Sequence, residues 1–311
     1  LHALGELRAD AGLSFIALST LRVLGAENQA EREARERVFR KVSVAPRTSV
    51  SLDASELNGL SPSETSAAYS SLLRAVMASA GEIDQLEPAR FGASRSHKLS
   101  PRDVNALRDE ATTMANALGL RISDFYVGGD DAKRIVAMPR EDELLFLVGS
   151  DVSSPLNPTD RAQVALQLAA THLHTLPLLS RTHAQGARLI FAAMAACECP
   201  LPATILKGEL GDLPRSVGLA LPRKTRKALP DLARTLPDQG AAVEHHIKLA
   251  LQHTRRLALL LSGHLEPALE NVLGALPSPE AIAGSAEALD LIATWTSSNM
   301  DALRNRLGFA R

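Results

Sequence analysis

Apolar residues recur at helical spacing through most of the chain and form strand-like runs only in a short central part. Helical patterns cover residues 1–41 and the chain from Pro158 to the C-terminus. Between them, three short runs rich in β-branched, aromatic and aliphatic residues predict strands at 121–128, 134–140 and 143–149. Because these strands do not alternate with helices, we predict an α+β chain, predominantly α-helical, with a small three-stranded antiparallel sheet.

The helix before the first strand has clear start and stop signals. Serine is favoured at the N-cap and proline at the first helical position, which predicts a start at Ser100 and Pro101. Asp103 adds the acidic charge that suits a first turn. Gly119 ends the pattern, because glycine readily adopts the left-handed conformation that closes many helices.

Serine, proline and glycine are concentrated between the first helices and this one. Residues 42–61 have the composition of a linker, Ser63 opens a further helix, and 83–99 are again irregular. The sequence therefore predicts three parts: a helical end at 1–41, a linker and helical connection at 42–99, and a helical domain with the small sheet at 100–311.

Charge and cysteine content exclude several classes of function. The chain has 34 basic and 35 acidic residues, so its net charge of −1 gives no general attraction to nucleic acid or to an anionic membrane. No apolar run reaches the roughly 18 residues that a membrane span needs. Cys197 and Cys199 are too close for an easy mutual disulfide and too few for a zinc site. We expect a reducing compartment, with the cytoplasm as the default, no nucleic-acid partner and no membrane span.

The first block resembles the end of a tetratricopeptide repeat (TPR) array. Leu4 and Gly5, then Ala17 and Leu21, fall at the offsets of the small and apolar positions through which the two helices of a TPR hairpin pack. One hairpin cannot bury its apolar face alone. The resemblance therefore implies that residues 1–41 are the last unit of an array lying upstream.

The order of elements around the sheet resembles the core of HtpX-like zinc metalloproteases. In "NALGL…ISDFYVG…RIVAMP…ELLFLVGSDV…TDRAQVALQLAATHLH", a helix ends in a Leu-Gly turn, three strands follow, and a loop leads into a helix. In that family this last helix carries H-E-x-x-H. Its two histidines bind zinc from one helix face, and its glutamate polarises the metal-bound water.

The resemblance aligns the five motif positions with residues 170–174, "ATHLH". Ala170 takes the place of the first histidine and Thr171 that of the catalytic glutamate, so only His174 keeps a ligand-type residue. His172 cannot replace the missing ligand, because residues two apart on a helix point about 200° away from each other. The resemblance thus implies a motif that has lost its base and one ligand.

The third ligand of the family is a glutamate on a later helix, which aligns with residues 249–273, "LALQHTRRLALLLSGHLEPALENVL". Leu251 takes the ligand position and Arg255 that of the supporting acidic residue. The chain is more similar to the degenerate metalloprotease-like region that follows TPR arrays in large bacterial proteins of uncharacterised function. This resemblance implies a pseudoenzyme with no catalytic residues, no metal and no cofactor.

Two alternatives stay open at this point. The first is a hydrolase with a non-standard metal site, for which His174, His183 and His253 are the candidate cluster, with His172 and His246 as further ligands. The second is a structural subunit of a larger assembly, because abundant Ala/Leu helices can leave apolar faces unsatisfied within one chain.

The leading hypothesis is a non-catalytic protein-interaction or scaffolding module. It predicts protein partners or self-assembly, with function located in surfaces. One candidate surface is the edge of the sheet, where strand 143–149 would pair with an extended peptide. Another is the basic stretch 222–234, "PRKTRKALPDLAR", as a docking surface for an acidic partner.

Overall fold

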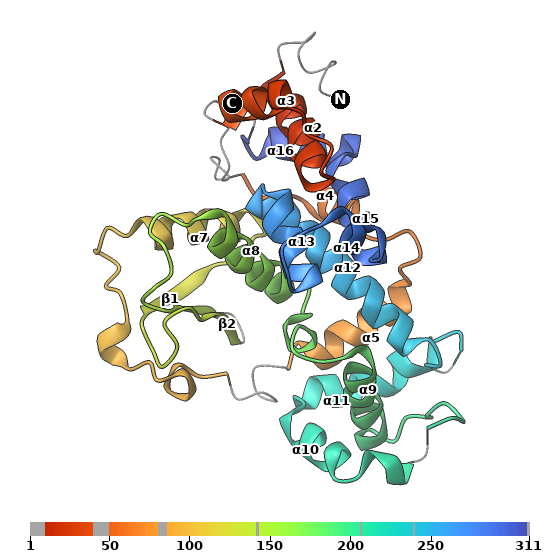
Figure 1. Ribbon diagram of the computed structural model, residues 1–311. Coiled ribbons are helices and arrows are strands. Elements are labelled where there is room, and N and C mark those ends of the chain that lie inside the picture. Colours follow the sequence, from red (N-terminus) through yellow and green to blue (C-terminus); the bar gives the residue numbers. More distant parts are fainter. Residues whose placement is uncertain are drawn as a thin grey trace.

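Helices make up most of the chain, and three strands form one small sheet (Figure 1). The computed structural model describes residues 10–39, 50–79, 86–140, 143–205, 207–238 and 240–309. The longer helices are α2 (Ala11–Val23), α3 (Gln29–Phe39), α5 (Ala67–Met77), α7 (Ala106–Ala117), α8 (Pro158–His172), α9 (His183–Ala196), α10 (Leu213–Ala220), α11 (Arg223–Arg234), α12 (Val243–Ser262), α13 (Leu265–Leu273), α15 (Ala286–Trp295) and α16 (Ser298–Arg306). The shorter elements are α4 (Ala54–Asn58), α14 (Pro279–Ala283) and the 3-10 turns η1 (Pro88–Phe91), η2 (Arg95–His97), η3 (Leu176–Leu178) and η4 (Lys207–Leu210). The prediction of a predominantly helical α+β chain is confirmed.

The three predicted strands are present, but their pairing differs from the prediction. They are β1 (Ile122–Val127), β2 (Ile135–Arg140) and β3 (Glu143–Val148), in the spatial order β1-β3-β2. β2 and β3 pair antiparallel, whereas β1 and β3 pair parallel. The expected antiparallel sheet is therefore wrong for one pair. β3 takes the central position, and Leu144 to Val148 are all buried because both faces of the sheet are covered, one by the large group of apolar side chains and the other by the segment around η1.

The central position of β3 rules out the expectation that strand 143–149 offers a free edge. The outer edges belong to β1 and β2, and both already have partners. The Leu99 N–H donates to the Phe125 carbonyl at 2.8 Å on the β1 side. On the β2 side, the Ala137 N–H donates to Oε1 of Gln167 from α8 at 3.1 Å. Any strand addition would have to displace these bonds.

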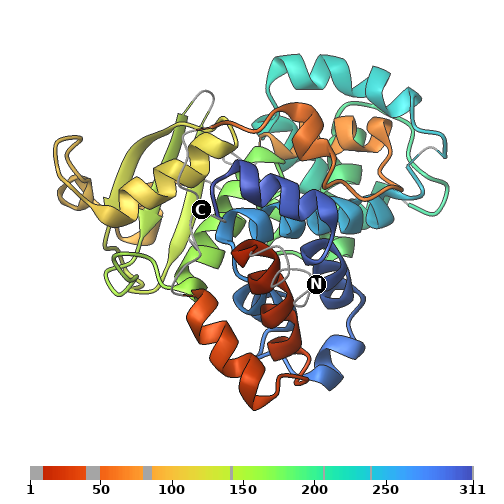
Figure 2. The same ribbon diagram turned by 90° about the horizontal axis from the view of Figure 1, so that it is seen from above.

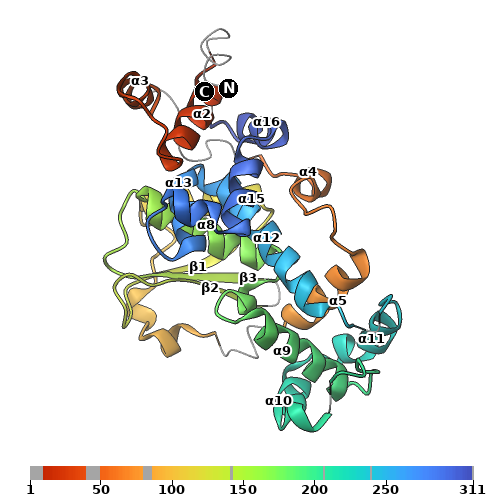
Figure 3. The same ribbon diagram turned by 45° about the vertical axis from the view of Figure 1, so that its right-hand side comes forward.

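Two groups of buried apolar side chains organise the helices, and α12 runs through both. The large core joins one face of the sheet to α2, α7, α8, the second half of α12 and the helices α13 to α16. The small core joins α5, α9, α10, α11 and the first half of α12. Figure 3 shows α8 lying over the sheet, with α9, α10 and α11 in a separate lobe below. The other face of the sheet is covered by the segment around η1, where Phe91 packs with Met138 and Leu145.

The N-terminal helices pack against the C-terminal ones. α2 lies beside the last helices of the chain in two views (Figures 1 and 2). Phe15 and Ile16 are buried in the large core, and the Trp295 Nε1–H donates to the Ile16 carbonyl at 3.3 Å. α2 and α3 form a helical hairpin, while Leu4 and Gly5 of the TPR-like pattern lie outside the described residues. Within the described residues, no helix combines the length and apolar character that crossing a bilayer requires.

The start of α7 differs from the predicted one. α7 begins at Ala106, and Asn105 is its N-cap, with Oδ1 accepting the Arg108 N–H at 2.9 Å. Ser100 forms a local turn instead, because its N–H donates to the Asp103 carboxylate at 2.8 Å. Two competing capping residues lay five positions apart, and the later one starts the helix. The predicted stop is confirmed, since Gly119 has a φ of +68°.

Candidate functional site

The positions that would hold zinc chemistry lie where α8 packs against α12. Asn157 caps α8 by accepting the Asp160 N–H at 2.8 Å. Ala170 is 0 % exposed, Thr171 7 % and Leu251 4 %, so all three are inside the protein. The Thr171 hydroxyl donates to the Gln167 carbonyl within its own helix at 2.8 Å. These positions therefore contribute packing and a local hydrogen bond rather than metal ligands.

His174 lies beyond the end of α8, which contradicts its expected place one helical turn after Ala170. The helix ends at His172, and His174 has a φ of +55°, in the left-handed region. The Thr175 N–H donates to the Ala170 carbonyl at 2.8 Å, a bond typical of a closed helix end. Pro177 lies in the 3-10 turn η3 that follows, so the chain resumes helical geometry only after this break. A pair of ligands on one helix face is therefore not formed.

Three histidines line a cavity of about 140 Å³ between α5, the end of α8 and α12. We call it the histidine cavity, and it is lined by His174, His246, His253 and Arg74 among others. Burial lowers the pKa of His253 to about 4, and its Nε2 lies 3.1 Å from the Leu57 carbonyl. Burial and the charge of Arg74 also lower the pKa of His174. The imidazole of His253 is therefore neutral at physiological pH.

The histidine cavity brings together only two of the three residues that the sequence suggested as a metal cluster. His174 and His253 line it, whereas His183 lines a different cavity. The positive charge of Arg74, which disfavours protonated His172 and His174, also disfavours a divalent cation. Within the described ranges, no group of three or more His, Cys, Asp or Glu side chains is placed to hold a metal ion.

A second cavity, of about 320 Å³, lies between α8, η3, the start of α9, α12 and α13. Its lining includes His183, Arg255 and Leu251. We call it the arginine cavity. Leu251 and Arg255 are the two positions that the resemblance to HtpX-like metalloproteases assigned to the third ligand and its supporting acid. In the structure they bring an apolar surface and a positive charge to one cavity.

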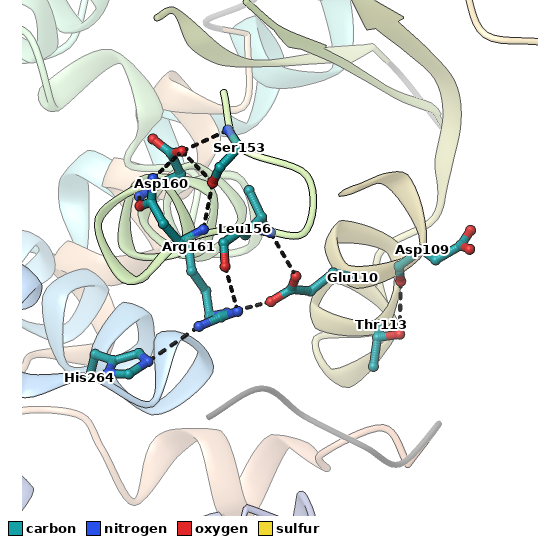
Figure 4. A network of polar contacts seen from close by, with 9 residues as sticks. Asp109, Glu110, Thr113, Ser153, Leu156, Asp160, Arg161 and His264 are labelled. Carbon is teal, nitrogen blue, oxygen red and sulfur yellow. Dashed lines mark hydrogen bonds and ion pairs between the residues drawn. The ribbon is translucent and has the colours of Figure 1, made fainter. Parts of the chain in front are cut away.

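Sequence reasoning missed a buried polar network between α7, α8 and α13 (Figure 4). Arg161 is 6 % exposed and forms an ion pair with Glu110. Its other nitrogens contact the Leu156 carbonyl at 2.7 Å and Nε2 of His264 at 3.2 Å. Burial, then the charges of Arg161 and Arg304, lower the pKa of His264 to about 3, so its neutral ring accepts from Arg161. The network ties the loop between β3 and α8 to two helices.

The signal for this network was present in the sequence pattern. Arg161 occupies a position on the buried face of α8, next to Ala162 and one turn before Ala165. A charged residue in an apolar stripe requires a buried partner. The partners Glu110 and His264 are 51 and 103 residues away, so the sequence alone does not identify them.

A second buried arginine, Arg304, lies where α2 packs against the C-terminal helices. Arg304 is 2 % exposed, and its guanidinium lies 4.4 Å from the ring centroid of Trp295, 4.9 Å from that of Phe309 and 5.3 Å from that of Phe15. Burial lowers its pKa to about 9. The negative faces of three aromatic rings offset part of the cost of burying this charge.

An exposed basic surface lies on α10 and α11, in the lobe at the bottom of Figure 1. We define the basic surface as the exposed side chains of Arg215, Leu219, Arg223, Lys224, Arg226 and Lys227. None of its five cations forms an ion pair with a described residue, and Leu219 is 82 % exposed. Four of them lie in the first turns of α11, next to the positive end of its dipole. This region repels cations and attracts anions.

Comparison with known proteins gives no relative from which a function could be carried over: no protein-family model, curated protein or solved structure matches the chain.

Proposed function

We propose that this chain is a non-catalytic protein-interaction or scaffolding module, with a metalloprotease-like domain that lacks zinc chemistry and a TPR-like helical end. The observation that carries the proposal is the packing at the motif positions. Ala170 on α8 and Leu251 on α12 are both buried apolar side chains. Inserting a histidine and a glutamate there would require removal of core contacts. We infer that these positions now serve stability.

The basic surface is the proposed docking site. The positive charges of the basic surface favour an acidic binding partner. Association would reduce the repulsion between these charges and would place negative charge near the positive end of the α11 dipole. The exposed Leu219 beside them supplies apolar area, which interfaces need in addition to charge. The proposed partner is therefore a protein segment with acidic side chains and at least one apolar anchor.

The first experiment tests the absence of zinc chemistry. Isothermal titration of the full chain with zinc, together with a casein cleavage assay, is expected to show neither tight stoichiometric binding nor turnover. Tight binding of one zinc per chain, with turnover abolished by His174→Ala, would overturn the proposal.

The second experiment tests the docking surface with a labelled peptide of alternating glutamate and leucine residues. Binding is expected to weaken with salt, and to weaken roughly tenfold in the double variant Arg223→Gln/Lys227→Gln. The matched control is Arg121→Gln/Lys133→Gln, which makes the same change in net charge at exposed positions near the sheet. Equal weakening in both double variants would show that only net charge matters, and would refute a docking surface on α11.

The alternative of a hydrolase with a non-standard metal site has less support. Its strongest observation is that His174, His246 and His253 share the histidine cavity. Arg74 lines the same cavity, and the Tyr69 ring stacks on His246 with centroids 3.9 Å apart. Elemental analysis of the purified chain separates the two proposals, since a hydrolase of this type would retain close to one metal per chain.

A further inference from the structure

The arginine cavity combines a half-buried positive charge with an apolar wall. On α12, Leu251, Arg255, Ala258 and Ser262 follow one another at spacings of four, three and four residues, so they form one stripe along the helix. This stripe lines the cavity. Opposite it lie Leu178 of η3, Leu179 and Arg181 of the following segment, and His183 in the first turn of α9.

Arg255 lacks a contacting counter-ion. Among the described residues its guanidinium forms no hydrogen bond and no ion pair, and burial lowers its pKa. Two carboxylates on α15, Glu287 and Asp290, act on it only from a distance. Arg255 is half-buried, so its guanidinium keeps some contact with water but has no acceptor among the described residues. An anion in the cavity would supply that acceptor.

The nearby carboxylates are already engaged by other cations. Asp290 forms a bidentate ion pair with Arg256, with N–O distances of 2.5 and 2.9 Å. Glu287 lies 3.5 Å from the Lys248 ammonium. Neither lines the cavity, and no acidic side chain is among its described lining residues. The field inside the cavity therefore favours an anion, and the positive end of the α9 dipole has the same sign.

Size and lining define the ligand class. A cavity of about 320 Å³ lies at the lower end of the roughly 300–1,000 Å³ that small-molecule pockets occupy. Much of its wall is aliphatic, with Leu166, Leu178, Leu179 and Leu251. Guanidinium groups bind carboxylates with two parallel hydrogen bonds. A fully ionic ligand such as phosphate would leave the aliphatic wall unused.

We propose that the arginine cavity binds a small aliphatic carboxylate, with its carboxylate on the Arg255 guanidinium and its hydrocarbon part against the leucine wall. The site is separate from the basic surface, so this inference goes beyond the proposed function and stands independently of it.

Calorimetric titration of the full chain with octanoate tests the proposal, with octanamide and inorganic phosphate as comparison ligands. Octanoate is expected to bind saturably, octanamide at least roughly tenfold more weakly, and phosphate more weakly than octanoate. Arg255→Met is expected to weaken octanoate roughly tenfold or more, while the control Arg121→Met, at an exposed position outside the cavity, leaves it unchanged. Equal binding of octanoate and octanamide, preferential binding of phosphate, or no binding of octanoate would each overturn the proposal.

A second measurement on the unmodified chain keeps the proposal testable if Arg255→Met fails to fold. The pKa of octanoate labelled with ¹³C at the carboxyl carbon is measured by NMR in the bound state. Contact with a guanidinium lowers the pKa of a carboxylic acid, whereas burial against apolar side chains raises it. A lowered pKa supports the contact with Arg255, and a raised pKa refutes it.

Discussion

The cations buried in the large core and the cations exposed around the small core differ in their partners. In the large core, the cations are enclosed by partners: Arg161 has Glu110, and Arg304 lies among three aromatic rings. In the lobe around the small core, the five cations of the basic surface have no ion-pair partner among described residues. Arg255 lies on α12 between these two regions. A cation enclosed by a counter-ion or by aromatic rings stabilises the fold, whereas an exposed or half-buried cation without an ion-pair partner is available for a ligand.

The largest effect is expected from breaking the network of the large core. Arg161→Ala removes the partner of Glu110, whose side chain is only 13 % exposed, and leaves a buried carboxylate uncompensated. The expected loss is about 3–5 kcal/mol in the free energy of unfolding, measured by urea denaturation. The double variant Arg161→Ala/Glu110→Ala should recover part of this loss. Additive losses in the two single variants would show that the pair is not coupled.

The histidines His253 and His264 are expected to make the stability of the protein depend on pH. The pKa of His264 is lowered to about 3 and that of His253 to about 4, both below the ordinary 6.5. As pH falls, the unfolded chain takes up protons first. The stabilising contribution is therefore complete above about pH 6.5 and is lost progressively as pH falls toward about 4 for His253 and about 3 for His264.

The measurement is the free energy of unfolding at about pH 7 and about pH 5. Each histidine is expected to contribute about 2 kcal/mol to the decline between these values. His264→Gln and His253→Gln should each flatten the decline relative to the unmodified chain. Asn305→Gln, at an exposed position without a titratable group, is the control and should leave the slope unchanged. Identical slopes in all four proteins would contradict the burial argument.

A smaller effect, of opposite sign, is expected at the basic surface. Lys224→Glu places a negative charge in the first turn of α11 and should raise the free energy of unfolding by about 0.3–1 kcal/mol. The same variant should bind the acidic peptide more weakly. Arg121→Glu, which makes the same change in charge outside α11, should show neither effect. A loss of stability in Lys224→Glu would mean that the lysine has a structural role.

The smallest effect is expected for Leu219→Ser. This side chain is 82 % exposed, so the change in the free energy of unfolding should stay within about 0.5 kcal/mol. Binding of the glutamate-leucine peptide should weaken nonetheless. Unchanged peptide binding would show that Leu219 is not part of the docking surface and that the surface binds through its charges alone.

Local signals in the sequence located the strands, but they did not determine how the strands pair or which capping residue starts α7. The three apolar runs located β1, β2 and β3 to within one residue at each end, because strand-forming residues and the turns between them are local properties. The parallel pairing of β1 with β3 was missed, since the same runs are compatible with several sheet orders. The start of α7 was missed because Ser100 and Asn105 are both good caps, and only the packed chain selects one.

The candidate site shows the same division. From the sequence alone, Ala170, Thr171 and Leu251 could be recognised as residue types that do not bind zinc, a property of their chemistry wherever they lie. Which histidines share a cavity, and that Arg255 lies in another without a contacting counter-ion, was decided by tertiary structure. Residue type determines which chemistry a side chain can perform. Its exposure to solvent, its hydrogen-bond and ion-pair partners and its pKa depend on segments that are distant in the sequence.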